Sequence, residues 1–241
     1  MAATYVIAMN QRRSVIQVAI DVTEEREALK IAGLIHESCK TGRISPSDVI
    51  IEAGTPLIKT AGVGILSKLK IAAPGIPLLA DMKTADVGKL EASLAYEHGA
   101  DYTTVLAVAP LSTVRAVIEA AAERKKGVSI DFLGLTPHAA RSKLEEILKE
   151  IEAGGVEPAK VIVSFHRGID EGAAHPSFFQ ELSSLVNLVR SRAPGVRVSI
   201  AGGLTPELKR TIESHFKPDI YVVGRYITSS PSAEKLLEFV G

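Results

Sequence analysis

Three ionisable side chains crowd into the stretch LLADMKTAD, which covers residues 78–86. The stretch opens as an apolar run and then places Asp81, Lys83 and Asp86 within six positions. Charged groups at the end of a buried strand need partners, because burying an unpaired charge is costly. Carboxylates that converge on a cation suit the binding of a metal ion, and a nearby ammonium can neutralise negative charge that develops on a substrate.

Other polar residues and glycines recur at the same place, directly after short apolar runs. These residues are Asp21, Glu52, Asp131, His166, Arg167, Gly202, Gly203, Gly224 and Arg225. Taken singly, each has a simpler explanation: Asp21 would suit the N-cap of the next helix, and Asp131 would hold a loop amide. His175 is expected on the surface of a loop. The repetition at the ends of successive strands is what favours one functional site.

The apolar runs alternate with segments of helical periodicity along the whole chain. Eight strands are predicted, at 15–21, 48–54, 76–83, 101–108, 128–134, 160–168, 196–203 and 219–225. A helix is expected after each strand, including a single helix over 58–72. Thr136 and Thr205 are predicted N-caps, since each precedes a proline that suits the first helical position.

Eight strand–helix units in order predict a parallel sheet closed into a (β/α)₈ TIM barrel, with residues 1–241 as a single domain. An open doubly wound sheet is the alternative. It is disfavoured because the segment AIDVTEE after the first strand lacks the glycine fingerprint of such folds. In a barrel, the carboxyl ends of the strands form one rim, and active sites sit there.

The composition excludes several classes of protein. Lys and Arg number 28, as do Asp and Glu, so no basic excess suggests a nucleic-acid partner and no charge run suggests a membrane surface. The single cysteine, Cys39, excludes an internal disulfide framework and fits a reducing cytoplasm. The first residues, MAATYVIAMNQRR, place their charges after their apolar residues, which is the wrong order for a secretory signal.

The rim residues predict metal-assisted chemistry on a small phosphorylated substrate. Glu52 and Asp81 come from adjacent strands and would repel each other unless a cation lies between them, which suits Mg²⁺. Lys83 is expected on the same face as Asp81 because strand side chains alternate. His166 could move a proton near neutral pH. The glycines after the seventh and eighth strands, with Arg225, would hold a phosphate. An enolate or enediolate intermediate is therefore expected, with the substrate itself left open.

The segments VAID, IEAGTPLIK, LADMKTADVGKLEA, FHRGID, AGGLTPE and VVGRYIT add a family resemblance. ADMKTAD resembles the D-x-K-x-x-D motif of the orotidine-5'-phosphate decarboxylase superfamily, and the other segments follow in that family's order. The chain looks most similar to an aldolase branch, especially its archaeal members, which joins formaldehyde reversibly to ribulose 5-phosphate. A sister branch decarboxylates 3-keto-L-gulonate 6-phosphate. Glu52 stands where the metal-free nucleotide enzyme has lysine, and Ile169 stands where the sister branch typically has arginine.

The resemblance implies a role for each site residue. Glu52 and Asp81 would bind Mg²⁺, with Mn²⁺ as an alternative ion, Lys83 would assist the enediolate, and His166 would abstract the substrate proton. Asp21 would contact substrate hydroxyls, while Gly203, Gly224 and Arg225 would hold the phosphate. Asp86 would reach into the site of a neighbouring subunit, which implies a homodimer. The segment SCKTGRISPSD is longer than the resemblance leads us to expect, but it is predicted to lie away from the catalytic rim.

Overall fold

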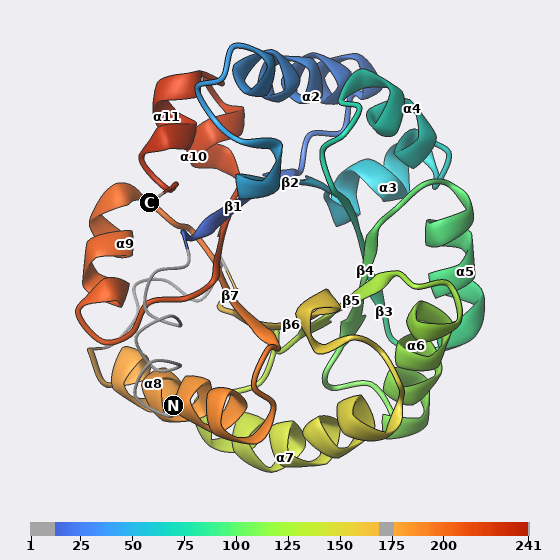
Figure 1. The fold of residues 1–241 in the computed structure, drawn as a ribbon, viewed down its shortest axis with the longest axis vertical. Helices are drawn as coiled ribbons and strands as arrows, with labels where there is room; N and C mark the ends of the chain where they lie inside the picture. The colour runs from blue at the N-terminus through green and yellow to red at the C-terminus, as the bar shows by residue number, and fades with distance from the viewer. Residues whose placement is uncertain (1–12, 169–175, 241) are drawn as a thin grey trace, which may run out of the picture.

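The computed structural model describes residues 13–168 and 176–240, which form a closed barrel of eight parallel strands in the order β1 to β8 (Figure 1). The strands are β1 Val15–Ile20, β2 Val49–Ala53, β3 Leu78–Thr84, β4 Tyr102–Leu106, β5 Gly127–Asp131, β6 Val161–His166, β7 Arg197–Ala201 and β8 Ile220–Val223. The predicted (β/α)₈ barrel is confirmed. Ile169 and His175, which entered the sequence analysis, lie outside the described residues.

The helices form a ring around the barrel (Figure 1). They are α2 Glu25–Lys40, α3 Thr55–Ala61, α4 Ile65–Ala72, α5 Gly88–Glu97, α6 Leu111–Glu123, α7 Pro137–Ala153, α8 Pro176–Arg192, α9 Pro206–Glu213, α10 Arg225–Thr228 and α11 Ala233–Leu237. Both predicted N-caps are confirmed: the side chain of Thr136 accepts a hydrogen bond from the backbone N–H of Ala139, and that of Thr205 accepts one from Leu208.

Most predicted strands end a few residues earlier than expected; the strand predicted at 128–134, for example, is β5 Gly127–Asp131. Two predictions differ in more than their bounds. The single helix expected over 58–72 is two helices, α3 and α4, because the chain turns at Gly62 with φ +74°. That left-handed conformation ends a helix and is readily adopted by glycine. The eighth strand ends at Val223, and residues from Arg225 onward form the short helix α10. The rim is therefore reached two residues earlier on β8 than predicted.

The interior of the barrel is filled at one end and polar at the other. Five apolar side chains, Val15, Ile50, Leu79, Ile162 and Ile220, form a separate buried cluster. They come from the inward-facing positions of β1, β2, β3, β6 and β8, because successive side chains of a strand point to opposite faces. Towards the carboxyl ends the same faces carry Gln17, Glu52, Asp81 and His166. The apolar floor positions polar groups above it instead of leaving a pore.

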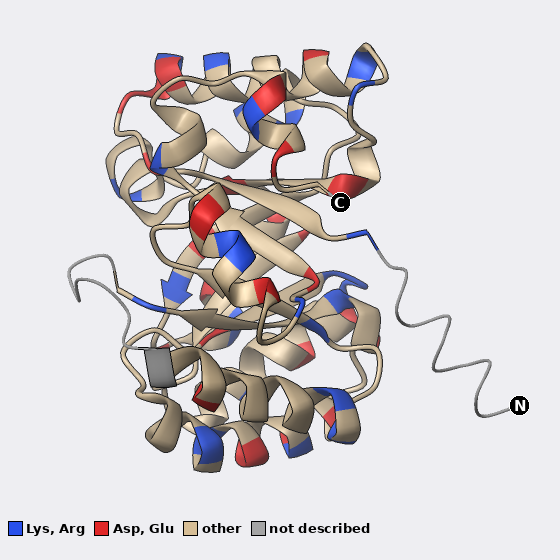
Figure 2. Cartoon of the chain, turned by 90° about the vertical axis from the view of Figure 1, so that its left-hand side faces the viewer, with Lys and Arg blue, Asp and Glu red and all other residues tan. Residues whose placement is uncertain are grey.

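The long segment before β2 lies at the far end of the barrel from these groups, as predicted. It includes a short 3₁₀ helix, Pro46–Asp48, capped by Ser45, and it leads into the amino end of β2. On the outside of the molecule, Lys and Arg alternate with Asp and Glu along the helices in the view of Figure 2. This mixed surface agrees with the balanced composition. Among the described residues, no helix is both long enough and apolar enough to traverse a bilayer.

Candidate active site

Four residues from three strand ends form one connected group at the rim. The Lys83 ammonium lies 2.8 Å from Asp81 Oδ2 and 3.2 Å from Asp131 Oδ2. His166 Nδ1 lies 3.2 Å from the same Asp131 oxygen. Asp81 and Asp131 are almost fully buried, with 7% and 4% of their side chains exposed, whereas Lys83 and His166 keep 24% and 22% open to the mouth. The carboxylates thus hold the two groups that can reach a substrate.

Asp81 is fixed by more than its ion pair. Thr55 Oγ1 lies 2.8 Å from both the backbone carbonyl and Oδ2 of Asp81. Thr104 Oγ1 donates to Asp81 Oδ1 at 2.9 Å. Both carboxylate oxygens are therefore held by hydroxyl groups as well as by Lys83. Such contacts fix the direction of the carboxylate before any ligand arrives.

Lys83 reaches Asp81 by a route that strand alternation does not describe. The β3–β4 pairing shifts register between Ala80 and Thr84, and Lys83 has φ +48°, a conformation rarely adopted by residues other than glycine. Lys83 lies on the same side as Asp81, as predicted, but the backbone between them is not the regular strand from which that prediction was made. A bulge turns the Lys83 side chain toward Asp81, and the Lys83 backbone N–H donates to Thr104 Oγ1 at 2.7 Å.

Electrostatics keep Lys83 protonated. Burial alone would lower the pKa of its ammonium, but the charges of Asp81 and Asp131 outweigh burial and raise that pKa. The pKa of Asp131 is lowered: burial opposes ionisation, but the contacts with His166 and Lys83 favour the charged form more strongly. Lys83 is accordingly a fixed positive charge at neutral pH and not a proton acceptor.

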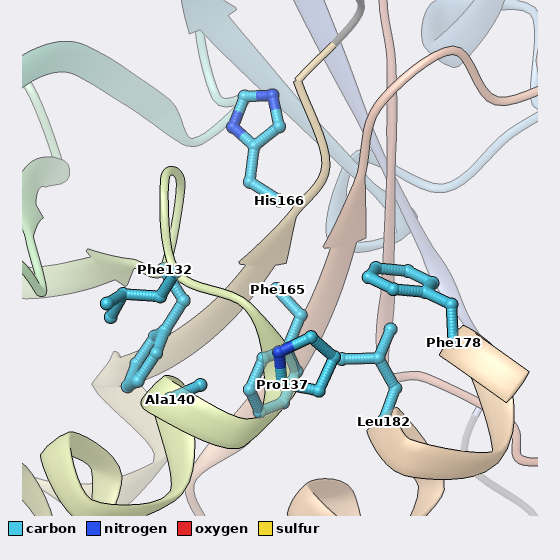
Figure 3. Close-up of a pocket in the computed structure, with 8 residues that line it drawn as sticks. Phe132, Pro137, Ala140, Phe165, His166, Phe178 and Leu182 are labelled. Carbon is cyan, nitrogen blue, oxygen red and sulfur yellow. The ribbon is translucent and has the colours of Figure 1, made fainter. Parts of the chain in front are cut away.

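His166 is the mobile-proton candidate of this group. It ends β6, and Figure 3 shows its ring pointing away from Phe132 and Phe165, which line an apolar pocket with residues of α7 and α8. Asp131 faces Nδ1, and a carboxylate there favours the tautomer with the proton on Nδ1. That tautomer leaves Nε2 with a lone pair that can accept a proton.

Glu52 is buried beneath Asp81, with 6% exposure. Burial raises the pKa of its carboxyl well above the ordinary value, and the negative charge of Asp81 raises it further. Gln17 Nε2 opposes this by donating to Glu52 Oε2 at 2.8 Å. The other polar atom of that amide, Gln17 Oε1, is buried without a hydrogen-bond partner. A positive charge near Glu52 and Asp81 would relieve their repulsion.

Asp21 lies at the same mouth, beyond β1. The first suggestion for it, an N-cap, is wrong, because α2 is preceded by Glu24 and makes no side-chain cap. Its carboxylate packs so closely on Gly54 that a Cβ there would lie 2.1 Å from Asp21 Oδ1, so this contact requires glycine. Although solvent reaches the open mouth, the surrounding protein atoms raise the pKa of Asp21 by desolvation, and Asp81 raises it further. The suggestion for Asp131 was correct: it accepts a hydrogen bond from the Leu133 backbone N–H at 3.0 Å, in addition to its contacts in the site.

The predicted phosphate residues border the mouth on the side of β7 and β8. Gly202 has φ +112°, and a Cβ there would lie 2.2 Å from the Arg167 carbonyl oxygen. Glycine is therefore needed at 202 for packing against the loop after β6. Gly203 is exposed and faces open space, and Gly224 lies next to the Asp21 carboxylate. Arg225 is exposed and, within the described part of the chain, forms no ion pair, although its charge lowers the pKa of Asp21. An anion at this edge would meet an available guanidinium.

Asp86 is the one predicted catalytic residue that is not brought into this group. It is exposed beyond the end of β3, and its Oδ1 accepts a hydrogen bond from the Val87 backbone N–H at 2.7 Å. Two apolar side chains that follow it in the chain, Val87 and Leu90, are 55% and 60% exposed. Asp86 is thus followed by apolar side chains that this chain leaves uncovered.

The donor set decides whether Mg²⁺ fits. Glu52 and Asp81 supply hard carboxylate oxygens, the ligand type that Mg²⁺ prefers. The described residues contain no group of three or more His, Cys, Asp or Glu side chains arranged to hold a metal. Two carboxylate ligands would leave the other coordination positions of Mg²⁺ to water or substrate, and protein-bound Mg²⁺ usually keeps several water ligands. A cation between Glu52 and Asp81 would offset the negative charge of Asp81, which adds to burial in raising the pKa of Glu52.

Sequence reasoning missed Gln17, Gly54, Thr55 and Thr104, which position the charged residues. One signal was available for Gln17, because it is the one polar residue in the run VIQVAI. Thr55 and Thr104 carried no such signal, since threonine is common both at helix starts and in strands.

Comparison with known proteins adds a family. Residues 14–238 match the model of the orotidine 5'-phosphate decarboxylase / HUMPS family. A 3-hexulose-6-phosphate synthase from Mycobacterium gastri is 37% identical over 78% of this chain and 80% of that protein. A crystal structure of 3-hexulose-6-phosphate synthase has a TM-score of 0.71 at 30% identity and covers 93% of this chain and 97% of the other.

A decarboxylase is also structurally similar, at lower identity. The crystal structure of 3-keto-L-gulonate-6-phosphate decarboxylase from Vibrio cholerae has a TM-score of 0.71 at 25% identity and covers 94% of this chain and 95% of the other. Because a mycobacterial protein is among the similar relatives, the expected resemblance to archaeal forms in particular is not borne out.

Proposed function

Because this chain belongs to the orotidine 5'-phosphate decarboxylase / HUMPS family, we propose that it is a lyase with 3-hexulose-6-phosphate synthase activity. The reaction joins formaldehyde to D-ribulose 5-phosphate and is reversible. The observation that carries the proposal is the connected group of Asp81, Lys83, Asp131 and His166 at the rim. It combines a proton acceptor with a fixed positive charge, which enediolate chemistry requires.

The proposed reaction begins with proton removal from C1 of ribulose 5-phosphate. His166 Nε2 takes that proton, and the electron pair of the C–H bond moves to form the 1,2-enediolate. The Lys83 ammonium stabilises the negative charge on the enediolate oxygen. The enediolate oxygen then re-forms the C2 carbonyl, the electron pair of the C1–C2 double bond forms a C–C bond to the formaldehyde carbon, and the electron pair of the formaldehyde carbonyl moves to its oxygen. The proton held by His166 returns to that oxygen and completes the hydroxymethyl group.

Mg²⁺ is the proposed cofactor, with Mn²⁺ as an alternative, and Glu52 and Asp81 are the residues that would hold it. When bound, Mg²⁺ would supply a Lewis acid that eases removal of a proton next to a carbonyl. Gln17 and Thr55 would hold the two carboxylates in place for it. Treatment with EDTA is expected to abolish turnover, and added Mg²⁺ or Mn²⁺ to restore it. Full activity after exhaustive chelation would refute the proposed metal requirement.

The phosphate of the sugar is assigned to the side of β7 and β8. Gly202, Gly203 and Gly224 would bring backbone amides to the phosphate, and Arg225 would add a charge-assisted contact. Asp21 would then lie near the substrate hydroxyls at the centre of the mouth. The balanced net charge and mixed surface support a small-molecule substrate and not a nucleic acid. The free Cys39 supports a reducing location, for which we propose the cytoplasm.

A homodimer with shared sites is part of the proposal. Among the described residues, Asp86 forms no hydrogen bond or ion pair with the group at the rim, and Val87 and Leu90, which follow it, are 55% and 60% exposed. Exposed apolar patches of this kind mark interaction sites. A second copy covering this surface would bury the apolar side chains and could carry Asp86 to the partner's mouth.

The alternative is a decarboxylase of the same family acting on 3-keto-L-gulonate 6-phosphate. An enediolate serves both reactions, so the group at the rim does not separate them. The curated relatives support the synthase, with 37% identity to the Mycobacterium gastri enzyme. Identity to solved structures separates the two less clearly, because one synthase structure is 30% identical and another is 25% identical, as the decarboxylase is. The sequence adds Ile169, where the sister branch typically has arginine.

One experiment decides between the two activities. The purified protein is given ribulose 5-phosphate with formaldehyde and, separately, 3-keto-L-gulonate 6-phosphate. We expect formaldehyde-dependent consumption of the pentose phosphate, and release of formaldehyde from the hexulose phosphate. Rapid release of carbon dioxide from the second substrate, with no reaction of the first, would overturn the synthase and establish the decarboxylase.

A further inference from the structure

Thr104 on β4 contacts both members of the Asp81–Lys83 pair with one atom. Its hydroxyl oxygen accepts a hydrogen bond from the Lys83 backbone N–H at 2.7 Å and donates its proton to Asp81 Oδ1 at 2.9 Å. The side chain is buried, with 4% exposure, below the open mouth. It touches the backbone of one residue and the carboxylate of the other.

The Thr104 hydroxyl sits where the regular sheet is interrupted. Pairing between the strands stops at Ala80 and Thr103 and resumes at Thr84 and Val105, so β3 uses two more residues than β4 over this stretch. The interruption contains Asp81, Met82 and Lys83. A bulge leaves backbone groups without their ladder partners, and a buried N–H without an acceptor is unfavourable. The hydroxyl of Thr104 supplies the acceptor for Lys83.

The same contact supports an unusual backbone conformation. Lys83 has φ +48°, which a residue with a Cβ adopts only when its surroundings hold it there. That conformation turns the lysine so that its ammonium lies between Asp81 and Asp131. A hydroxyl can accept from one partner and donate to another, whereas the isosteric side chain of valine can do neither.

We propose that Thr104 is a positioning residue, which holds the Lys83 bulge and the Asp81 carboxylate in the geometry that stabilises the enediolate. Thr104 does not touch the substrate; it acts through Lys83 and Asp81. This inference rests on the proposed function for its kinetic consequence, but its geometric content does not depend on which reaction the protein catalyses.

The test compares three substitutions. Thr104→Val keeps the shape and removes the hydroxyl, Thr104→Ser keeps the hydroxyl, and Thr103→Val is the matched control on the neighbouring residue. Thr103 is fully buried, and its hydroxyl bonds only weakly, at 3.3 Å, to the Ala80 carbonyl. Each variant is assayed for kcat and KM with ribulose 5-phosphate and formaldehyde, and folding is checked by circular dichroism.

We expect Thr104→Val to lower kcat by about 10- to 100-fold, the usual consequence of losing hydrogen bonds to charged groups, with little change in KM. Thr104→Ser should recover most of kcat, and Thr103→Val should stay close to wild type. Equal losses in Thr104→Val and Thr103→Val, or no recovery in Thr104→Ser, would overturn the proposal and indicate a packing role. If Thr104→Val does not fold, Thr104→Ala takes its place, with the same expected loss of kcat and the same contrary outcome.

A crystal structure of Thr104→Val separates this inference from the proposed function. We expect Lys83 to leave its positive φ and its ammonium to move away from Asp81. If wild type lacks synthase activity but the variant shows this rearrangement, the proposed function fails and the positioning role stands. An unchanged Lys83 in the variant would refute the positioning role whatever the reaction.

Discussion

Asp131 offers the sharpest test of the proposed proton transfer, through the substitution Asp131→Asn. One of its oxygens, Oδ2, accepts from both Lys83 Nζ and His166 Nδ1 at 3.2 Å, and the other accepts from the Leu133 backbone N–H at 3.0 Å. An asparagine has one oxygen and one NH₂ group. If the NH₂ group replaces Oδ2, it faces Lys83 and His166; if it replaces Oδ1, it faces the Leu133 N–H. Either way a donor meets a donor, so those hydrogen bonds are lost together with the negative charge.

The size of the effect follows from these contacts. A hydrogen bond to a charged group is worth ~1.5–3 kcal/mol, and each ~1.4 kcal/mol is a factor of ten, so losing the His166 contact in the transition state should slow proton removal by about 10- to 100-fold. Asp131 is 3% exposed, so water cannot readily replace the lost acceptor. The loss should therefore fall on the rate of proton removal, with a smaller effect on KM.

The assay isolates that step by omitting formaldehyde. Ribulose 5-phosphate is incubated with the enzyme in deuterium oxide, and exchange of the C1 hydrogen is followed by NMR. Asp219→Asn is the matched control, because Asp219 also accepts a hydrogen bond from a backbone N–H, that of Val198, but lies at the opposite end of the barrel. Exchange by Asp131→Asn at the wild-type rate would refute the role assigned to the Asp131–His166 contact.

Three further predictions follow from the same site. Burial and the charge of Asp81 raise the pKa of Glu52, so the folded, metal-free protein binds a proton there more tightly than the unfolded chain does. This proton binding stabilises the folded state at low pH, and the stabilisation is lost as pH rises from the unfolded pKa through the raised folded pKa. Metal-free Glu52→Gln should therefore unfold at a higher temperature than wild type at pH 8, with a smaller difference near pH 4.5; thermal melts that show the opposite trend would contradict this. Arg225→Ala should raise KM for ribulose 5-phosphate about 10- to 100-fold, because a charge-assisted contact is lost, and an unchanged KM in steady-state kinetics would place the phosphate elsewhere. Mixing inactive Asp86→Ala subunits with inactive Lys83→Ala subunits should restore activity, since a hybrid dimer with shared sites has one site free of both defects; a mixture that stays inactive after exchange would show that Asp86 serves its own chain.

The architecture could be predicted because it depends on repetition. Eight apolar runs alternating with helical patterns admit few solutions, and the polar residues at the ends of the runs identified the rim. The caps at Thr136 and Thr205 followed from local chemistry and are confirmed. The break of the 58–72 helix at Gly62 was missed because a glycine inside a helical pattern is often tolerated, and only its positive φ ends α3.

The sequence predicted which residues belong to the candidate site, but not the hydrogen bonds and ion pairs that connect them. Alternation placed Asp81 and Lys83 on one face, but the structure joins them through a bulge at which alternation fails. Bulges depend on which partner can satisfy the displaced backbone, and here that partner is Thr104, on another strand. No local pattern in residues 78–86 reveals it. For Asp131 the sequence suggested only a contact with a loop amide, because its importance in the site lies in touching two residues from different strands.

The contacts of Lys83 indicate which of two roles it has, a question that the residue type alone leaves open. A lysine at an active site can act as a base when its pKa is depressed, or as a fixed charge when its pKa is raised. Two nearly buried carboxylates lie within 3.2 Å of the Lys83 ammonium and raise its pKa, so it is a poor proton acceptor at neutral pH. In the tautomer that donates from Nδ1 to Asp131, His166 directs the lone pair of Nε2 away from that carboxylate. Proton removal and charge stabilisation are thus divided between two residues, and Asp131 connects them.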